Sequence, residues 1–257
     1  MKAGVFFFTL LLLIACESSD MHPSAALPVR EIVTDLSTGN QLGIKTYTYE
    51  GGKVTHEYFA GNPKYALSTE VVYEYDLAGR LTKRKERTPE LSDAFQYIVE
   101  TTYRLGLKTK EVYYNGDQVN YQIVYYNSGT HPDSAQFFSY SQELQNFRFS
   151  HPIYYTYNDA GQLVEKFELF KTSYTYDQRG NLLTECTDLG DKQICSAINE
   201  YDSEGRKTKW KSKEWQGEAN KEEYFYAGSL LIGKKVWDYP VYGDINQPVI
   251  TKVEYEY

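Results

Sequence analysis

A short segment recurs along this chain, and it restricts the possible folds more than any other feature. Four copies align without gaps: YEYDLAGRL at 73–81, YTYNDAGQL at 155–163, YTYDQRGNL at 174–182 and NEYDSEGRK at 199–207. Weaker copies surround Tyr47, Tyr103, Tyr125 and Tyr224, and Tyr255 begins half of another. Self-similarity at a loose period of roughly 20–30 residues indicates one supersecondary unit repeated along the chain.

Each copy contains the signature of a tight hairpin. Asp or Asn followed three residues later by Gly is typical of a type I turn, and a left-handed Gly closes it into a three-residue loop with a bulge. This geometry places Tyr75 opposite Leu81, and it predicts the same pair in the later copies. Since four nearly identical copies cannot be four active sites, we interpret the turn residues as structural. They are Asp76, Gly79, Asn158, Gly161, Asp177, Gly180, Asp202 and Gly205.

The Tyr-Asp-x-x-Gly pattern resembles the Rhs/YD-repeat family across most of residues 45–257. In large members of that family, many such hairpins spiral into a hollow β shell that encloses a toxic cargo or forms an adhesive ectodomain. The repeats here are too few to close a large shell. We therefore expect an all-β domain over 31–257, built as a curved antiparallel meander of repeated β-hairpins, in the form of an open sheet or partial shell.

The N-terminus predicts export. Lys2 precedes an apolar run from Val5 to Ile14 that ends in Ala15 and Cys16, the pattern of a secretory signal peptide over 1–15. The segment LIAC at 13–16 resembles the lipobox of bacterial lipoproteins, which implies lipidation of Cys16 and a membrane anchor. Residues 16–30 read as a disordered tether. In such lipoproteins Glu17, rather than Asp, favours the outer membrane, while the leaflet stays open.

The two remaining cysteines flank a second kind of turn. Gly190 in the first central position predicts a type II′ hairpin, which sets Cys186 directly opposite Cys195. Opposed cysteines in an exported protein are expected to form a disulfide. Two free buried thiols are the alternative.

Composition excludes several classes of function. A net charge of −8 argues against nucleic acid, because we expect no basic face to neutralise phosphates. The four histidines lack metal-site spacing, and neither a nucleophile elbow, a P-loop nor a dinucleotide fingerprint is present. We therefore expect no metal, no cofactor and no enzymatic activity.

Two segments interrupt the repeat and are the candidate binding loops. Residues 128–152 are rich in Phe and polar groups, and residues 237–248 bring together Trp237, Tyr239 and Tyr242. Loops on a rigid scaffold commonly carry binding, although these could instead cover the sheet. The resulting hypothesis is an envelope lipoprotein that binds or scaffolds a glycan or protein, with these rings exposed around one concavity. The alternatives are a component or immunity-type partner of a Rhs-like toxin system and an envelope hydrolase.

Overall fold

The computed structural model describes residues 26–214, 217–238 and 248–257, and the regular structure in these ranges is entirely β-strand. The first nine strands are β1 Arg30–Asp35, β2 Gln41–Glu50, β3 Lys53–Gly61, β4 Thr69–Tyr75, β5 Leu81–Arg87, β6 Tyr97–Arg104, β7 Leu107–Asn115, β8 Gln118–Ser128 and β9 His131–Ser141. The other nine are β10 Asn146–Tyr157, β11 Leu163–Phe167, β12 Lys171–Tyr176, β13 Leu182–Asp188, β14 Gln193–Tyr201, β15 Lys207–Glu214, β16 Gly217–Ala227, β17 Leu230–Asp238 and β18 Val249–Glu256. Within the described ranges, no helix is long and apolar enough to cross a membrane.

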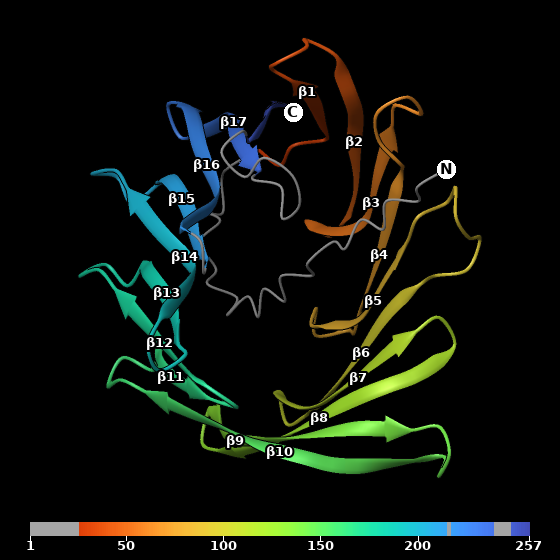
Figure 1. Cartoon of the computed structure of the whole chain (residues 1–257), viewed down its shortest axis with the longest axis vertical. Helices are drawn as coiled ribbons and strands as arrows, with labels where there is room; N and C mark the ends of the chain where they lie inside the picture. Colours follow the sequence, from red (N-terminus) through yellow and green to blue (C-terminus); the bar gives the residue numbers. More distant parts are fainter. Residues whose placement is uncertain (1–25, 215–216, 239–247) are drawn as a thin grey trace.

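The strands form one antiparallel sheet of 18 strands that closes on itself (Figure 1). Strands adjacent in sequence pair with each other, and β18 pairs with β1, where Val253 lies opposite Val33. The predicted all-β antiparallel meander is confirmed, but the predicted open sheet or partial shell is wrong, because the sheet is a β-barrel. Closure satisfies the backbone N–H and C=O groups that two free edge strands would expose.

The closing contact completes a repeat that the sequence divides between its two ends. Tyr255 and Tyr257 occupy the positions of the two repeat tyrosines, and β1 supplies the partner strand that elsewhere follows the turn. The backbone N–H of Val29 donates to the carbonyl of Glu256 at 2.8 Å. Arg30, which we assigned to the tether, is the first residue of β1. The barrel thus contains nine hairpin units, one of them made from both ends of the chain.

The repeat turns have the geometry that their sequence predicts. In the first turn, the N–H of Gly79 donates to the carbonyl of Asp76 at 2.8 Å, and the N–H of Asp76 donates to the carbonyl of Arg80 at 2.9 Å. Hydrogen bonds from the Arg80 backbone and side chain lower the pKa of the Asp76 carboxyl. All four motif glycines adopt positive φ angles: 78° at Gly79, 77° at Gly161, 89° at Gly180 and 82° at Gly205. The paired positions across the four turns are Tyr75–Leu81, Tyr157–Leu163, Tyr176–Leu182 and Tyr201–Lys207.

The second tyrosine of each unit fastens it to the preceding unit. The phenol hydroxyl donates to a backbone carbonyl of the hairpin before it, as in the 3.1 Å bond from Tyr103 to Leu81. Asn127 occupies the same position in one unit and donates through Nδ2 to the carbonyl of Lys108 at 3.0 Å. The other pairs are Tyr49–Pro28, Tyr75–Val54, Tyr157–Pro132, Tyr176–Leu163, Tyr201–Leu182, Tyr226–Lys207 and Tyr257–Leu231. Neighbouring units are therefore joined by side chains as well as by ladders.

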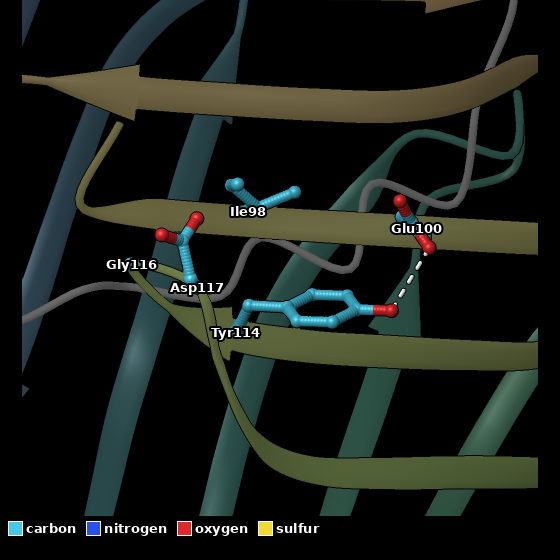
Figure 2. A pocket seen from close by; sticks show the side chains of 5 residues that line it. All are labelled: Ile98, Glu100, Tyr114, Gly116 and Asp117. Atoms are coloured by element: carbon cyan, nitrogen blue, oxygen red, sulfur yellow. Dashed lines mark hydrogen bonds between the residues drawn. The ribbon is translucent and has the colours of Figure 1, made fainter. Parts of the chain in front are cut away.

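Alternation along each strand separates an inner face from an outer face. Figure 2 shows Ile98 and Tyr114 on the outer face, with strands of the opposite wall behind them. Val99 and Tyr113 occupy the alternate positions and pair with each other on the inner face. The repeat tyrosines share this inner face. Because 18 strands imply a backbone diameter of about 35 Å, side chains from opposite walls cannot meet across the axis.

The best-packed part of the inner face lies on β7–β10. Ala135 and Ile153 pair across β9 and β10 and are 0% and 1% exposed. Beside them, four rings stack across four strands, with centroid distances of 4.2, 5.0 and 4.9 Å along Tyr113, Tyr121, Phe137 and His151. Burial raises the pKa of the Tyr121 phenol to about 12. Because each ring covers the face of the next, the stack braces the wall rather than offering an open platform.

Candidate functional site

Trp237 lies on the outer wall, on strand β17. Its indole ring has two ammonium groups close to it, with Lys221 Nζ at 4.2 Å and Lys235 Nζ at 4.6 Å from a ring centroid. The side chain is half-buried between neighbouring strands. We expected it in a loop around a concavity. That interpretation is wrong, because β17 continues to Asp238 and places Trp237 within the regular ladder.

Lysines from four strands surround this ring. In one row across the barrel, Lys211 on β15 lies opposite Lys221 on β16, which lies opposite Trp237. In the adjacent row, Lys209 lies opposite Glu223, Glu223 opposite Lys235, and Lys235 opposite Lys252 on β18. We call this surface the lysine–tryptophan wall, and it consists of Lys209, Lys211, Lys221, Lys235, Lys252 and Trp237. Alternate residues of a strand share a face, so both rows project outward.

Glutamates pair with several of these lysines. The carboxylate of Glu200 lies 3.5 Å from the ammonium group of Lys209. Glu223 pairs with Lys221, and Glu254 pairs with Lys252, each at 2.6 Å. Two pairs of like charge nevertheless lie directly opposite each other across a ladder, Lys211 with Lys221 and Lys235 with Lys252. Directly opposed like charges destabilise a sheet by several tenths of a kcal/mol or more, up to about 1 kcal/mol. Residues that violate a local rule of this kind are often functional.

The outer wall of β4–β6 provides the contrast, because its charges alternate. Lys83 lies opposite both Glu74 and Glu100 and makes an ion pair of 2.7 Å with Glu100. Lys85 makes an ion pair of 2.5 Å with Glu74, and Arg87 pairs with Glu70. We call this surface the balanced wall, and it consists of Lys83, Lys85, Arg87, Glu70, Glu74 and Glu100. Like-charge opposition is thus a local property of the lysine–tryptophan wall and not a general habit of this barrel.

Composition alone does not show how charge is distributed over the barrel. The net charge of −8 led us to expect no basic face. Five lysines lie on one wall, and glutamates pair with Lys209, Lys221 and Lys252. Many acidic groups face inward instead, such as Glu31, Glu57 and Glu111, which accept hydrogen bonds from the hydroxyls of Tyr47, Tyr73 and Tyr125. Burial together with these carboxylates raises the pKa of all three phenols.

The other predicted binding residues are placed as follows. Tyr239, Tyr242 and the lipidation residue Cys16 lie outside the described residues. We predicted that residues 128–152 form an irregular loop, and this prediction is wrong, because these residues form most of the long β9–β10 hairpin. Its aromatic residues pair across that hairpin in edge-to-face contacts, Phe138 with Phe149 at 5.9 Å and Tyr140 with Phe147 at 5.2 Å. The extra residues lengthen a hairpin rather than form a loop.

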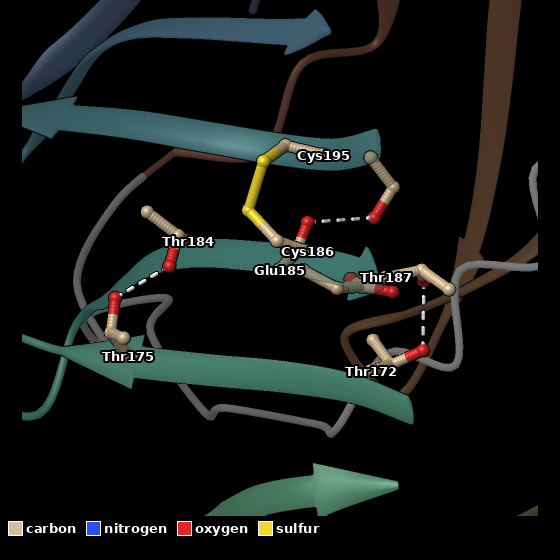
Figure 3. Close-up of a disulfide and its surroundings, with 8 residues drawn as sticks. Thr172, Thr175, Thr184, Glu185, Cys186, Thr187 and Cys195 are labelled. Atoms are coloured by element: carbon tan, nitrogen blue, oxygen red, sulfur yellow. Dashed lines mark hydrogen bonds between the residues drawn. A yellow bond between two sulfur atoms is a disulfide. The ribbon is translucent and has the colours of Figure 1, made fainter. Parts of the chain in front are cut away.

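Cys186 and Cys195 form a disulfide in the predicted register, with Cα atoms 3.9 Å apart (Figure 3). Leu189 donates its N–H to the carbonyl of Lys192 at 2.8 Å, as expected for a two-residue turn. Threonine pairs lie on the adjoining ladder, Thr172 with Thr187 at 2.8 Å and Thr175 with Thr184 at 2.6 Å. The disulfide reinforces the wall next to β15.

Two depressions in the described surface offer little enclosure. The smaller, of about 170 Å³, is lined by Ile98, Glu100, Tyr114, Gly116 and Asp117, and Tyr114 donates to Glu100 at 2.9 Å (Figure 2). The larger, of about 520 Å³, lies at the first repeat turn beside Lys53 and Tyr75.

One chain of hydrogen bonds resembles catalytic chemistry. Ser150 Oγ lies 3.0 Å from His151 Nδ1, and His151 Nε2 lies 3.0 Å from Glu168. Glu168 also pairs with Lys166 at 2.8 Å, and His151 stacks on Phe137. These residues line neither described depression. The chain of contacts is therefore best explained as part of the inner-wall brace.

The chain is similar to known proteins only at low sequence identity and low structural similarity. No protein-family model and no curated protein matches the chain. Among solved structures, a TcdB2-TccC3-Cdc42 structure matches at 15% identity and a TM-score of 0.34, covering 82% of this chain and 12% of that chain. A structure of the Photorhabdus luminescens Tc holotoxin pore matches at 15% identity and a TM-score of 0.35, covering 85% of this chain and 12% of that chain. A porin-like protein from Bacteroides uniformis matches at 9% identity and a TM-score of 0.41, covering 90% of this chain and 98% of that chain. The chain spans about an eighth of the two toxin chains, and its function has to be inferred from its own residues.

Proposed function

We propose that this protein is an envelope lipoprotein that binds a glycan or protein partner through the lysine–tryptophan wall and catalyses no reaction. The observation that carries the proposal is the pair of lysine–lysine oppositions beside Trp237. Each opposition places two ammonium groups on neighbouring strands, where like charges repel each other. A bound partner carrying negative charge would convert that repulsion into attraction, and the indole would add apolar contact.

The charged side chains on the outer face support the proposal that the barrel is surrounded by water rather than by lipid. A membrane-spanning barrel presents an outward apolar band about 25 Å tall, and a Lys or Arg at its midplane costs about 2–4 kcal/mol. Here charged side chains alternate outward along β4, β5, β15, β16 and β18. We infer that a lipid on Cys16, rather than the barrel, holds the protein at the membrane.

The geometry of the chain ends supports this anchoring. β1 begins at Arg30, beside the end of β18, at the rim that carries the repeat turns. A lipid anchor on the preceding segment would place this rim toward the membrane. The walls of the barrel would then stand roughly upright, where a partner in the envelope can reach them.

Capture from the native envelope tests the proposal. Tagged full-length protein is compared with Lys221→Gln/Lys235→Gln/Trp237→Ala and with Lys83→Gln/Lys85→Gln/Tyr114→Ala, which removes two lysines and an aromatic ring from the balanced wall and its neighbouring strand. The first variant should lose the captured partner while the second keeps it, with thermal melts verifying that both fold. Cys16→Ser should release the protein from the membrane fraction. Retention of the same partner by the first variant would refute the proposal.

A second candidate is a component of a Rhs-like toxin system. Hairpins with the Tyr-Asp-x-x-Gly turn close into a barrel in this chain. This favours the second candidate, because large Rhs/YD-repeat proteins are expected to form closed shells from the same kind of hairpin. The neighbouring genes discriminate between the two, since a toxin gene beside this one supports the second candidate and a polysaccharide-uptake cluster supports the first.

A further inference from the structure

Assuming the proposed binding function, we infer that the ligand of the lysine–tryptophan wall is an acidic polysaccharide. The wall is a surface of regular strands, and neither described depression lies on it. An extended ligand that lies across several strands suits such a surface, whereas a small molecule requires a concave site.

The type and spacing of the cations favour a chain with regularly repeated charges. The charged donors are all lysines, whose flexible ammonium groups act as point charges, unlike the planar fork with which arginine recognises a single carboxylate. Neighbouring strands place them about 4.8 Å apart, and alternate residues of one strand, such as Lys209 and Lys211, are about 6.8 Å apart. Carboxylates or sulfates repeated along a glycan can contact several of these lysines at once, beside the glutamates that already pair with Lys209, Lys221 and Lys252.

Trp237 favours a sugar over other anions. Its half-buried ring stands between two lysines in the middle of the wall. A pyranose offers apolar C–H groups on one face and charged groups at its edge. An indole flanked by ammonium groups can therefore contact both parts of one sugar unit.

Nucleic acid fits this surface less well. Single strands are held by series of stacked aromatics, but the described outward positions of these two rows carry one aromatic ring. An acidic protein partner would need a desolvated apolar centre, whereas charged lysines make up all of the wall except Trp237.

Polymer binding by the full-length protein tests the inference. Polygalacturonate, heparin and neutral dextran are titrated against the protein, with an oligothymidylate and phosphatidylglycerol vesicles as further probes. We expect an acidic polysaccharide to bind, dextran to show no binding, and affinity to fall linearly with log salt concentration. Lys211→Gln/Lys221→Gln/Lys235→Gln should weaken binding at least tenfold. Lys83→Gln/Lys85→Gln/Lys110→Gln should change it less than twofold.

The outcomes separate this inference from the proposed function. Equal or tighter binding of the oligonucleotide or the vesicles would overturn the assignment to polysaccharide. Failure of every acidic polysaccharide to bind would also overturn it, while wall-dependent capture of another envelope partner would leave the proposed function intact. If the wall variants capture and bind everything that the parent protein does, both fail.

Discussion

Lys211 on β15 lies directly opposite Lys221 on β16, on the outer face of the barrel. Two positive charges in this relationship repel each other, and a chain selected only for stability would place a glutamate at one position. The Glu74–Lys83–Glu100 row on the balanced wall shows that this sequence makes such pairs elsewhere. The proposed binding of a negatively charged partner rests on this opposition.

The first prediction follows from that opposition. Replacing Lys211→Glu places opposite charges across the ladder, so this cross-strand pair should contribute roughly 0.2–1 kcal/mol more to the free energy of unfolding than the lysine pair does. The same variant should bind an acidic polysaccharide more weakly, by at least fivefold. Chemical denaturation and titration of one preparation measure both quantities. A variant that gains no stability and keeps its affinity would show that the opposition has no functional meaning.

A second prediction concerns the side-chain links between units. Tyr103→Phe removes the hydroxyl that donates to Leu81, so denaturation should show a loss of about 1 kcal/mol. The control is Tyr97→Phe, since Tyr97 is 50% exposed and its change should cost less than about 0.5 kcal/mol. Equal losses in the two variants would mean that the links do not hold the barrel together.

The disulfide provides a third prediction. Cys186 and Cys195 are separated by nine residues, and a loop of that size corresponds to about 2–3 kcal/mol in the chain-entropy model. Cys186→Ser/Cys195→Ser should lose about that much stability while retaining ligand affinity, because the bridge lies off the lysine–tryptophan wall. The oxidised parent protein should also gain two hydrogens in mass on reduction. A variant with reduced affinity but unchanged stability would contradict this assignment of roles.

Alkaline pH should unfold the barrel. Burial raises the phenol pKa of Tyr121 to about 12, and it raises the pKa of Tyr47, Tyr113 and Tyr224 further. A free tyrosine has a pKa of about 10, so the unfolded chain releases these protons at a lower pH than the folded barrel does. Their contribution to stability is therefore complete below about pH 10 and is lost as the pH rises toward 12 and above. Tyrosinate absorbance should rise together with the loss of β circular dichroism. Ionisation of these phenols in a fully folded protein would be the contrary result.

The sequence predicts the local units of this fold well. A turn such as 76–79 depends on one carboxylate and one left-handed glycine, and both act within a few residues. The Tyr75–Leu81 and Cys186–Cys195 pairs follow from turn length alone, and the structure has both. Strand pairing within a hairpin can therefore be predicted from the local sequence without knowledge of the overall fold.

Closure could not be read in the same way. The strand that completes the ninth unit is the segment REIVTD at 30–35, which contains none of the repeat motif and lies more than 200 residues from its partner on β18. The half repeat at Tyr255 can be recognised in the sequence, but the strand that completes it lies at the opposite end of the chain. Only the pairing of β1 with β18 in the folded barrel brings the two halves together.

The candidate site was hidden for a related reason. Lys211, Lys221, Lys235 and Lys252 come from four strands, and their convergence depends on three ladders, one of which has a bulge between Lys211 and Lys213. Trp237 was visible as an unusual residue. The lysines near it could not be identified from the sequence, because their positions relative to Trp237 depend on the register of these ladders.

Hydrogen exchange of the full-length protein with and without an acidic polysaccharide tests the central claim most directly. The account predicts slower amide exchange in β15–β18, centred on Trp237, with no change in the balanced wall of β4–β6. Protection at β4–β6 or on the aromatic stack of β7–β10, or no protection of β15–β18 when the ligand is bound, would contradict it.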